Sequence, residues 1–267
     1  MRAAAEKVRV KNLWGVLVSV PGIVDENSGR VLFSPNLHWT EQANIAKLLQ
    51  TIWPVPMRLV QEEWALALGH QFVEAVDEDF LLVDFGAGVG GAVILGGKLY
   101  ANPLPLSGEL GHTPVRGNAR ECGCGAVGCV ETLVSRKGLL QSLVESQGKE
   151  PAQWADLAEH IKAKGVKPWL ATTLEDTAVV IAGALNVLGL RRVIVTGSLV
   201  ELPPAVMEYL RGAVIQGSMW ARFGEVLVQS APRRRTAGLV AVGIDRLVLP
   251  MTAQLRGEPE GEAAEAL

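Results

Sequence analysis

Three cysteines and one histidine lie close together near the middle of the chain. Cys122, Cys124 and Cys129 are the three cysteines of the 267 residues, and His112 precedes the first of them by ten positions. One imidazole and three thiols bind zinc tetrahedrally, and the glycines between them let a short loop bring the sulfurs to one point. Because four protein ligands leave no position for water, we expect a structural zinc site. The alternative is three buried free thiols beside an unrelated histidine.

The residues around this cluster form a long motif. Residues 108–112 read Gly-Glu-Leu-Gly-His, and residues 122–131 read Cys-Gly-Cys-Gly-Ala-Val-Gly-Cys-Val-Glu. This motif resembles the signature of the ROK (repressor/ORF/kinase) family, which contains bacterial sugar kinases and sugar-responsive transcriptional repressors. Weaker matches at residues 20–22, 36–39 and 84–91 extend the resemblance over about residues 13 to 248. The resemblance implies an α/β protein with the two-lobed actin-like ATPase (ribonuclease H-like) fold.

Two carboxylates flank the predicted zinc site. Glu109 lies three residues before His112, and Glu131 lies two residues after Cys129. Carboxylates suit a sugar, because each accepts from neighbouring hydroxyls and an unpaired buried hydroxyl is costly. The resemblance implies that Glu109, His112 and Glu131 contact the sugar, the histidine through its nitrogen not bound to zinc, and it implies a further contact from Asn36. Alternatively, the two glutamates are only acids at helix starts, where the helix dipole favours them.

The parts needed for phosphoryl transfer are incomplete or altered. A kinase must position the ATP phosphates and supply a base for the accepting hydroxyl. The family's first phosphate loop, Asp-x-Gly-Gly-Thr, is absent from the 19 residues before Val20. We therefore expect an incomplete first lobe. Glu62 stands where the resemblance implies an aspartate base, and alternatively it is an exposed acid at a helix start.

A glycine-rich turn is the remaining candidate for nucleotide binding. Gly86, Gly88 and Gly90 allow the backbone to approach a phosphate, although such a turn can equally serve strand packing. Residues 196–198 read Thr-Gly-Ser, where kinases of the family carry consecutive glycines near the adenosine. ATP and magnesium are therefore expected only if the chain is a kinase.

Strands alternate with helices along the chain, which indicates an α/β fold. We expect strands at residues 13–20, 31–33, 57–60, 80–84, 91–95, 98–100, 192–196 and 226–229. We expect helices at residues 40–51, with Thr40 as N-cap, and at 62–76, 151–164, 173–188, 203–216 and 238–248. Residues 1–79 are predicted to form a partial N-terminal lobe, and 80–237 a C-terminal lobe with the zinc loop. A final helix within 238–256 is predicted to return to the first lobe, and 257–267 to form a disordered acidic tail.

Composition narrows the class of partner. The net charge of −3 provides no electrostatic footprint for nucleic acid through this chain alone. The basic run of Arg233, Arg234 and Arg235 is interpreted as a solvated loop rather than a phosphate clamp. An N-terminus without an apolar signal core, and the lack of a long uninterrupted apolar run, predict a cytoplasmic protein with no membrane partner.

Two functions remain from different classes. The first is the sugar-sensing core of a ROK-type transcriptional regulator, stabilised by zinc and without its own DNA-binding domain. The second is an ATP-dependent sugar kinase, of the glucokinase or N-acetyl-hexosamine kinase type, with degenerate or incomplete catalytic machinery. The altered phosphoryl-transfer residues favour the sensor. Because family members are often dimers or tetramers, we expect a homo-oligomer.

Overall fold

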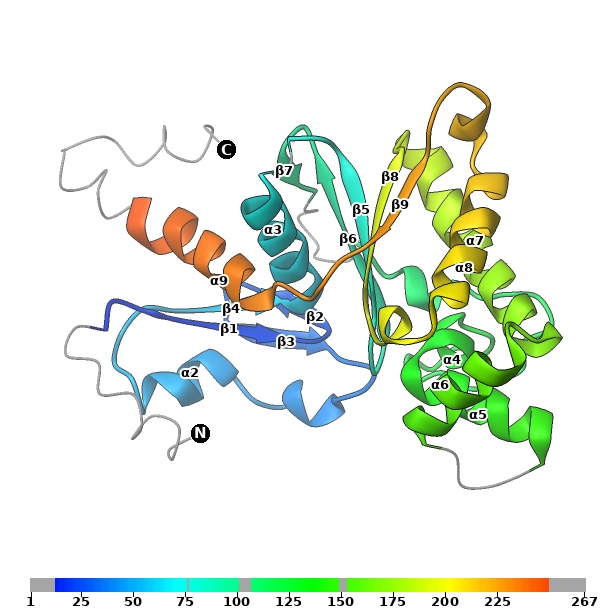
Figure 1. Cartoon of the computed structure of the whole chain (residues 1–267). Coiled ribbons are helices and arrows are strands. Elements are labelled where there is room, and N and C mark those ends of the chain that lie inside the picture. Colours follow the sequence, from blue (N-terminus) through cyan, green and yellow to red (C-terminus); the bar gives the residue numbers. More distant parts are fainter. Residues whose placement is uncertain (1–12, 76, 101–106, 149–152, 250–267) are drawn as a thin grey trace. The chain divides into compact units, whose positions relative to one another are not determined.

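The chain folds into two compact units. The computed structural model describes residues 13–75, 77–100, 107–148 and 153–249 (Figure 1). The first unit comprises residues 1–77, 97–105 and 234–267, and the second comprises residues 78–96 and 106–233. The sequence-based boundaries at 79 and 237 stay predictions of domain organisation. The predicted tail at 257–267 lies outside the described residues.

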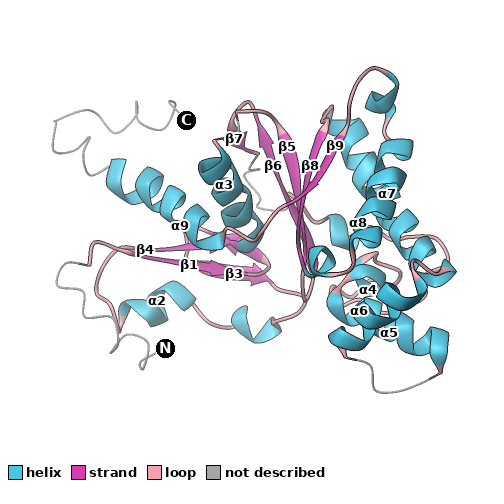
Figure 2. Cartoon of the chain, viewed as in Figure 1, coloured by secondary structure: helices cyan, strands magenta, loops and turns pink. Residues whose placement is uncertain are grey.

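The first unit is built on a pair of parallel strands. Its strands are β1 (Val16–Val20), β2 (Ile23–Asp25), β3 (Arg30–Phe33), β4 (Met57–Gln61) and β7 (Lys98–Leu99), and its helices are α2 (Ile45–Gln50), α3 (Glu62–Glu74) and α9 (Arg235–Gly243), the last continued by a π-helix (Ile244–Val248). β1 pairs in parallel with β4, and β2 pairs antiparallel with β3. The β1–β4 pair lies between α2 on one face and α3 with α9 on the other (Figure 2).

Two glycines let α3 and α9 approach closely. A Cβ on Gly238 of α9 would lie 1.7 Å from the carbonyl oxygen of Ala65 on α3. A Cβ on Gly69 of α3 would lie 2.1 Å from the carbonyl oxygen of Arg234. The two helices therefore pack backbone against backbone, and no larger residue fits at either position without moving one of them.

The second unit is a mixed sheet covered by helices. Its strands are β5 (Phe80–Phe85), β6 (Val89–Leu95), β8 (Arg192–Gly197) and β9 (Leu227–Ser230), and its helices are α4 (Glu131–Val134), α5 (Arg136–Gln147), α6 (Trp154–Lys164), α7 (Pro168–Leu188) and α8 (Pro204–Gly217). Within this unit the sheet order is β6-β5-β8-β9, with β5 antiparallel to β6 and parallel to β8. Every residue of β5 is buried, as its continuous apolar run predicts for a central strand. α7 and α8 pack side by side along the sheet (Figure 1).

The helix α7 is long and apolar enough to cross a membrane by length and composition alone. However, eight of its side chains are buried, and five of these belong to the core of the second unit: Leu170, Leu174, Ala178, Ile181 and Leu185. Long core helices of globular domains meet the same criterion. The packing therefore explains the apolar character of α7 without a membrane.

Two local predictions were wrong. The predicted helix at 40–51 begins only at Ile45, because Asn44 caps it by accepting the backbone N–H of Lys47 at 2.8 Å. Thr40 instead ends a short 3₁₀ helix and donates its hydroxyl to the carbonyl of Leu37 at 2.7 Å. The three consecutive arginines are also not a merely solvated loop, since each forms an ion pair. The pairs are Arg233 with Asp84, Arg234 with Glu74, and Arg235 with Glu62.

The glycine contact between α3 and α9 predicts a measurable loss of stability. Gly238→Ala should lower the free energy of unfolding by about 1–3 kcal/mol or more, because the new methyl group overlaps the Ala65 carbonyl. Gly183→Ala on α7 is the matched control, since no atom lies within 4 Å of its Cβ position. It should stabilise by about 0.4–1 kcal/mol through lower backbone entropy. Urea unfolding of both variants measures the effects, and equal effects of one sign would contradict this account.

Candidate metal centre

Residues 120–129, called the metal loop below, form a small irregular hairpin. The backbone N–H of Cys122 donates to the carbonyl of Ala126 at 2.8 Å, and that of Gly128 donates to the carbonyl of Arg120 at 2.9 Å. Gly125 and Gly128 adopt φ of +90° and +89°, a conformation that residues with a Cβ rarely adopt. The tight reversal at these glycines carries Cys124 back toward Cys129.

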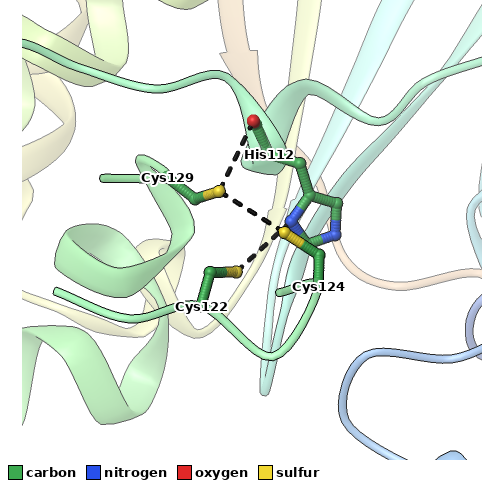
Figure 3. Close-up of side chains that lie close together, drawn as sticks. All are labelled: His112, Cys122, Cys124 and Cys129. Atoms are coloured by element: carbon green, nitrogen blue, oxygen red, sulfur yellow. Dashed lines mark hydrogen bonds between the residues drawn. The ribbon is translucent and has the colours of Figure 1, made fainter. Parts of the chain in front are cut away.

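The four predicted ligands converge on one point. Figure 3 shows the three sulfurs and the imidazole of His112 turned toward one another, and their ligand atoms all lie within 4.8 Å of one another. Cys122 Sγ lies 3.5 Å from His112 Nδ1, and Cys124 Sγ lies 3.6 Å from Cys129 Sγ. A zinc tetrahedron with bonds of about 2.0 Å to nitrogen and about 2.3 Å to sulfur has edges of roughly 3.5–3.8 Å. The donor set and its spacing therefore fit a tetrahedral zinc ion.

Ionising these thiols together is costly unless a cation is bound. Burial, together with the neighbouring thiols of Cys124 and Cys122, raises the pKa of the Cys129 thiol to about 12. Burial likewise raises the pKa of Cys122. Three thiolates so close together repel one another, and a divalent cation removes that cost because it binds the deprotonated form.

A single arginine fastens the metal loop to the helices beside it. Arg120 donates to the carbonyls of Thr132 and Gly138 at 2.6 and 3.2 Å. It also donates to the Ser142 hydroxyl at 2.9 Å and to the Glu145 carboxylate at 2.7 Å. These bonds tie the loop to α4 and α5, so the ligands are held from a rigid support.

Glu109 faces the outer side of the histidine. Its Oε2 lies 3.6 Å from His112 Nε2, while His112 Nδ1 faces Cys122. Burial raises the pKa of Glu109, and the nearby Glu131 carboxylate adds to the rise while His112 opposes it. A carboxylate on the far nitrogen of a ligating histidine is a common way to fix the ring orientation.

Glu131 connects the metal loop to the glycine turn. It is 6% exposed, and its Oε2 accepts the backbone N–H of Val89 at 2.7 Å. Its Oε1 lies 4.0 Å from Cys122 Sγ. Glu131 is also the first residue of α4, so the helix-start role considered from the sequence is present in the structure.

The structure thus brings Glu109, His112 and Glu131 together in the second unit. Two further predicted site residues belong to the first unit. They are Asn36, the remaining predicted sugar contact, and Glu62, which stands at the position of the catalytic base. Asn36 is exposed in the turn after β3. Glu62 begins α3 and forms an ion pair with Arg235, so its carboxylate already has a cationic partner.

The glycine turn links β5 to β6 in the second unit. Gly86 and Gly88 lie in the turn, and Gly90 pairs with Asp84 across the hairpin. Asp84 is 5% exposed and accepts from Thr196 Oγ1 at 2.7 Å and from the Arg233 guanidinium through two bonds of 2.7 Å. A buried carboxylate next to the turn is thus fully engaged by its own neighbours.

Comparison with known proteins identifies the family. The model of the ROK family matches residues 3–241. The chain belongs to the ROK family. The family assignment predicted from residues 108–131 is therefore confirmed.

ROK proteins of both functional types are similar to this chain. It is 25% identical to the xylose repressor of Caldicellulosiruptor bescii over 260 residues, covering 90% of this chain and 65% of the repressor. It is 27% identical to the xylose repressor of Bacillus subtilis, covering 88% of this chain and 62% of that protein. An N-acetylmannosamine kinase of Escherichia coli is 29% identical, covering 52% of this chain and 53% of the kinase. The chain spans less than two thirds of the length of each of these relatives.

Solved ROK structures share the fold. A ROK transcriptional regulator homologous to the E. coli MLC protein aligns with a TM-score of 0.72 at 19% identity, covering 89% of this chain and 64% of the regulator. The ROK hexokinase of Thermus thermophilus aligns with a TM-score of 0.70 at 21% identity, covering 91% of this chain and 81% of the enzyme. The predicted α/β class and actin-like ATPase fold are confirmed.

The structure adds functional candidates that the sequence did not reveal. Arg120 lies outside the motifs, and its partners are 12 to 25 positions away. Asp84 lies in the weak family match at residues 84–91 and Arg233 in the run of three arginines, but the two are separated by 149 positions. No sequence signal pairs them.

A zinc ion in this ROK loop predicts a metal-dependent stability. Purified protein should contain about one zinc per chain, because the four donors saturate a tetrahedral site. Cys124→Ser should destabilise by more than about 3 kcal/mol, since loss of a metal is among the largest single-residue effects. Cys124 is the least buried of the three cysteines, so the loss of packing contributes little.

The control for this prediction is Glu121→Gln, which changes an exposed acid of the same loop. Elemental analysis measures the zinc, and chemical unfolding with and without a chelator measures stability. Wild type and Cys124→Ser should become equally stable in the chelator. Metal-free wild type that unfolds as it does when loaded with zinc would contradict the prediction.

Proposed function

We propose that the chain carries the sugar-binding core of a ROK-type transcriptional regulator, stabilised by a structural zinc ion. The observation that supports this most is the orientation of His112, with Nδ1 toward the thiols and Nε2 toward Glu109. When zinc holds Nδ1, the proton lies on Nε2, which then donates outward. Zinc supplies rigidity here, and the ligand contacts come from the protein's side chains.

The ligand chemistry that fits is a neutral sugar. The 3.6 Å between His112 Nε2 and Glu109 Oε2 is too long for a strong hydrogen bond. A sugar hydroxyl can satisfy both groups, because it accepts from Nε2–H and donates to the carboxylate. Glu131 offers a second carboxylate nearby, and Asn36 is proposed as a further contact because the family resemblance implies it. Xylose is the first candidate, because repressors named for xylose are similar over most of this chain.

Sensing requires binding without group transfer. The carboxylates and the imidazole need only to hold hydroxyls in fixed positions, and this requires no base strong enough to deprotonate one. Glu131 also holds the Val89 N–H at the start of β6, so a ligand that contacts Glu131 acts on the sheet as well. We propose that this link transmits sugar binding beyond the pocket.

Binding of a neutral sugar is the prediction that tests this function. Titration calorimetry of zinc-loaded protein with xylose, glucose, mannose and N-acetylmannosamine should give heat for at least one of them. Glu109→Gln and Glu131→Gln should each weaken that binding by about 1–3 kcal/mol, because a hydroxyl loses its charged acceptor. Glutamine at 131 keeps an oxygen for the Val89 N–H.

Glu121→Gln again serves as the control and should bind the sugar as wild type does. All variants should retain zinc, so a loss of affinity would not reflect loss of the loop. The proposal fails if folded, zinc-loaded wild type gives no heat with any aldose at millimolar concentration.

The second candidate is an ATP-dependent sugar kinase, because an N-acetylmannosamine kinase is similar to about half of the chain. The ion pair of Glu62 with Arg235 weighs against it. We predict no turnover of ATP with these sugars at the roughly 1–100 s⁻¹ typical of kinases. Glu62→Asp should not restore activity. It supplies the aspartate that the family resemblance implies as the base, but an aspartate alone does not position the ATP phosphates. A coupled ADP assay measures this, and turnover in the stated range would establish the kinase instead.

The remaining proposals concern setting and assembly. We propose that the protein is cytoplasmic and forms a homo-oligomer, as the resemblance to the ROK family implies. We also propose that the described residues make no contact with DNA. Among the described strands, β1 pairs with β4 alone, and α7 exposes Val179 and Val187 by 70% and 85%. Such apolar edges and faces favour association. Sedimentation of the full chain measures the mass, and a monomer at micromolar concentration would exclude the assembly.

A further inference from the structure

The turn between β5 and β6 is filled by the protein's own arginine. Arg233 donates through Nε and Nη2 to the two oxygens of Asp84, each at 2.7 Å, and Nη2 lies 3.4 Å from the carbonyl of Phe85. A Cβ on Gly86 would lie 2.5 Å from Nη2. The guanidinium therefore occupies the space that the missing side chain of Gly86 opens. In a phosphate-binding turn, that space admits the ligand.

The backbone donors of the same turn are also engaged. The N–H of Gly86 donates to the carbonyl of Gly88 at 2.8 Å. The N–H of Val89 donates to Glu131 Oε2 at 2.7 Å. Phosphate cradles depend on backbone N–H groups that point to the ligand. Here two of them point to acceptors within the protein.

Charge favours this arrangement over a bound nucleotide phosphate. Asp84 is nearly buried, and Thr196 and Arg233 together supply its hydrogen bonds. A nucleotide phosphate that drew Arg233 away would leave a buried, unpaired carboxylate beside a polyanion. Removing one partner of a buried ion pair is strongly unfavourable, and two anions at one site repel each other. Binding of a phosphate at this turn is therefore unfavourable overall, even though the guanidinium is a cation.

We propose that Arg233 is a specificity-determining residue that, paired with Asp84, closes the glycine turn to nucleotide phosphates. The turn then serves as a junction between β5, β6 and the metal loop. This role does not depend on which sugar, if any, the chain binds. It explains why the turn keeps Gly86 while its open space is taken by a side chain from a distant part of the chain.

The test opens the turn without leaving a charge unpaired. The double variant Asp84→Asn/Arg233→Ala removes both charges and keeps an acceptor for the Thr196 hydroxyl. Calorimetry with MgATP should show no binding to wild type up to about 5 mM. The double variant should bind MgATP with a Kd at least about tenfold below that concentration. Adding Gly86→Ala should cancel the gain, because its methyl group refills the same space.

The matched control removes another ion pair of the same unit. Arg192 and Glu78 lie 2.6 Å apart, and Glu78→Gln/Arg192→Ala should leave MgATP binding as weak as in wild type. A folded double variant at Asp84 and Arg233 that binds no better than wild type would overturn the proposal. So would wild type that binds MgATP with a submillimolar Kd. Xylose titration of the same samples tests the sugar-binding function separately.

Hydrogen exchange of the wild-type protein provides a second test if the double variant does not fold. A peptide covering residues 86–89 should be partly protected without nucleotide, because the N–H groups of Gly86 and Val89 have internal acceptors. About 5 mM MgATP should not alter its exchange. A nucleotide-dependent change confined to this peptide would show that the turn receives phosphate and would refute the closure.

Discussion

Three thiolates within 4.8 Å of one another repel strongly unless a cation lies among them. This electrostatic constraint organises the second unit. The loop that satisfies it must reverse at Gly125 and Gly128, and it must be fixed to α4 and α5 by Arg120. Once the loop is fixed, His112 presents its outer nitrogen to Glu109 and Cys129 leads directly into Glu131. The positions of these polar groups thus follow from the fold of the cysteine-containing loop.

The glycine turn and the metal loop share one hydrogen bond, from Val89 to Glu131. On an actin-like scaffold the two regions serve different ligands, because a sugar needs carboxylates whereas ATP needs donors and cations. In this chain the turn's groups face inward, toward Asp84, Arg233 and Glu131. The polar groups of this turn are thus bonded within the protein. Fold alone would not distinguish these cases.

The sequence reveals those parts of the site whose chemistry is local. The cysteines and His112 lie within one short segment, and few donor sets other than a zinc site have that composition. The buried run of β5 likewise predicts a central strand from its own residues. The Asp84–Arg233 pair depends on a tertiary approach across 149 positions, and no periodicity or motif encodes such a contact. The start of α2 was misplaced because Asn44 and Thr40 are both competent caps, and only packing decides between them.

The bond between Asp84 and Arg233 also has a consequence for descent. Asp84 is buried, whereas the Arg233 side chain is 36% exposed. A change at Arg233 alone therefore leaves a buried carboxylate without its cation, a state that costs about 3–5 kcal/mol. That cost is a large part of the stability of an ordinary domain. A change at Asp84 alone leaves a cation that water still reaches, and so costs less. The two charges are therefore lost most readily in one order, Asp84 first and Arg233 second.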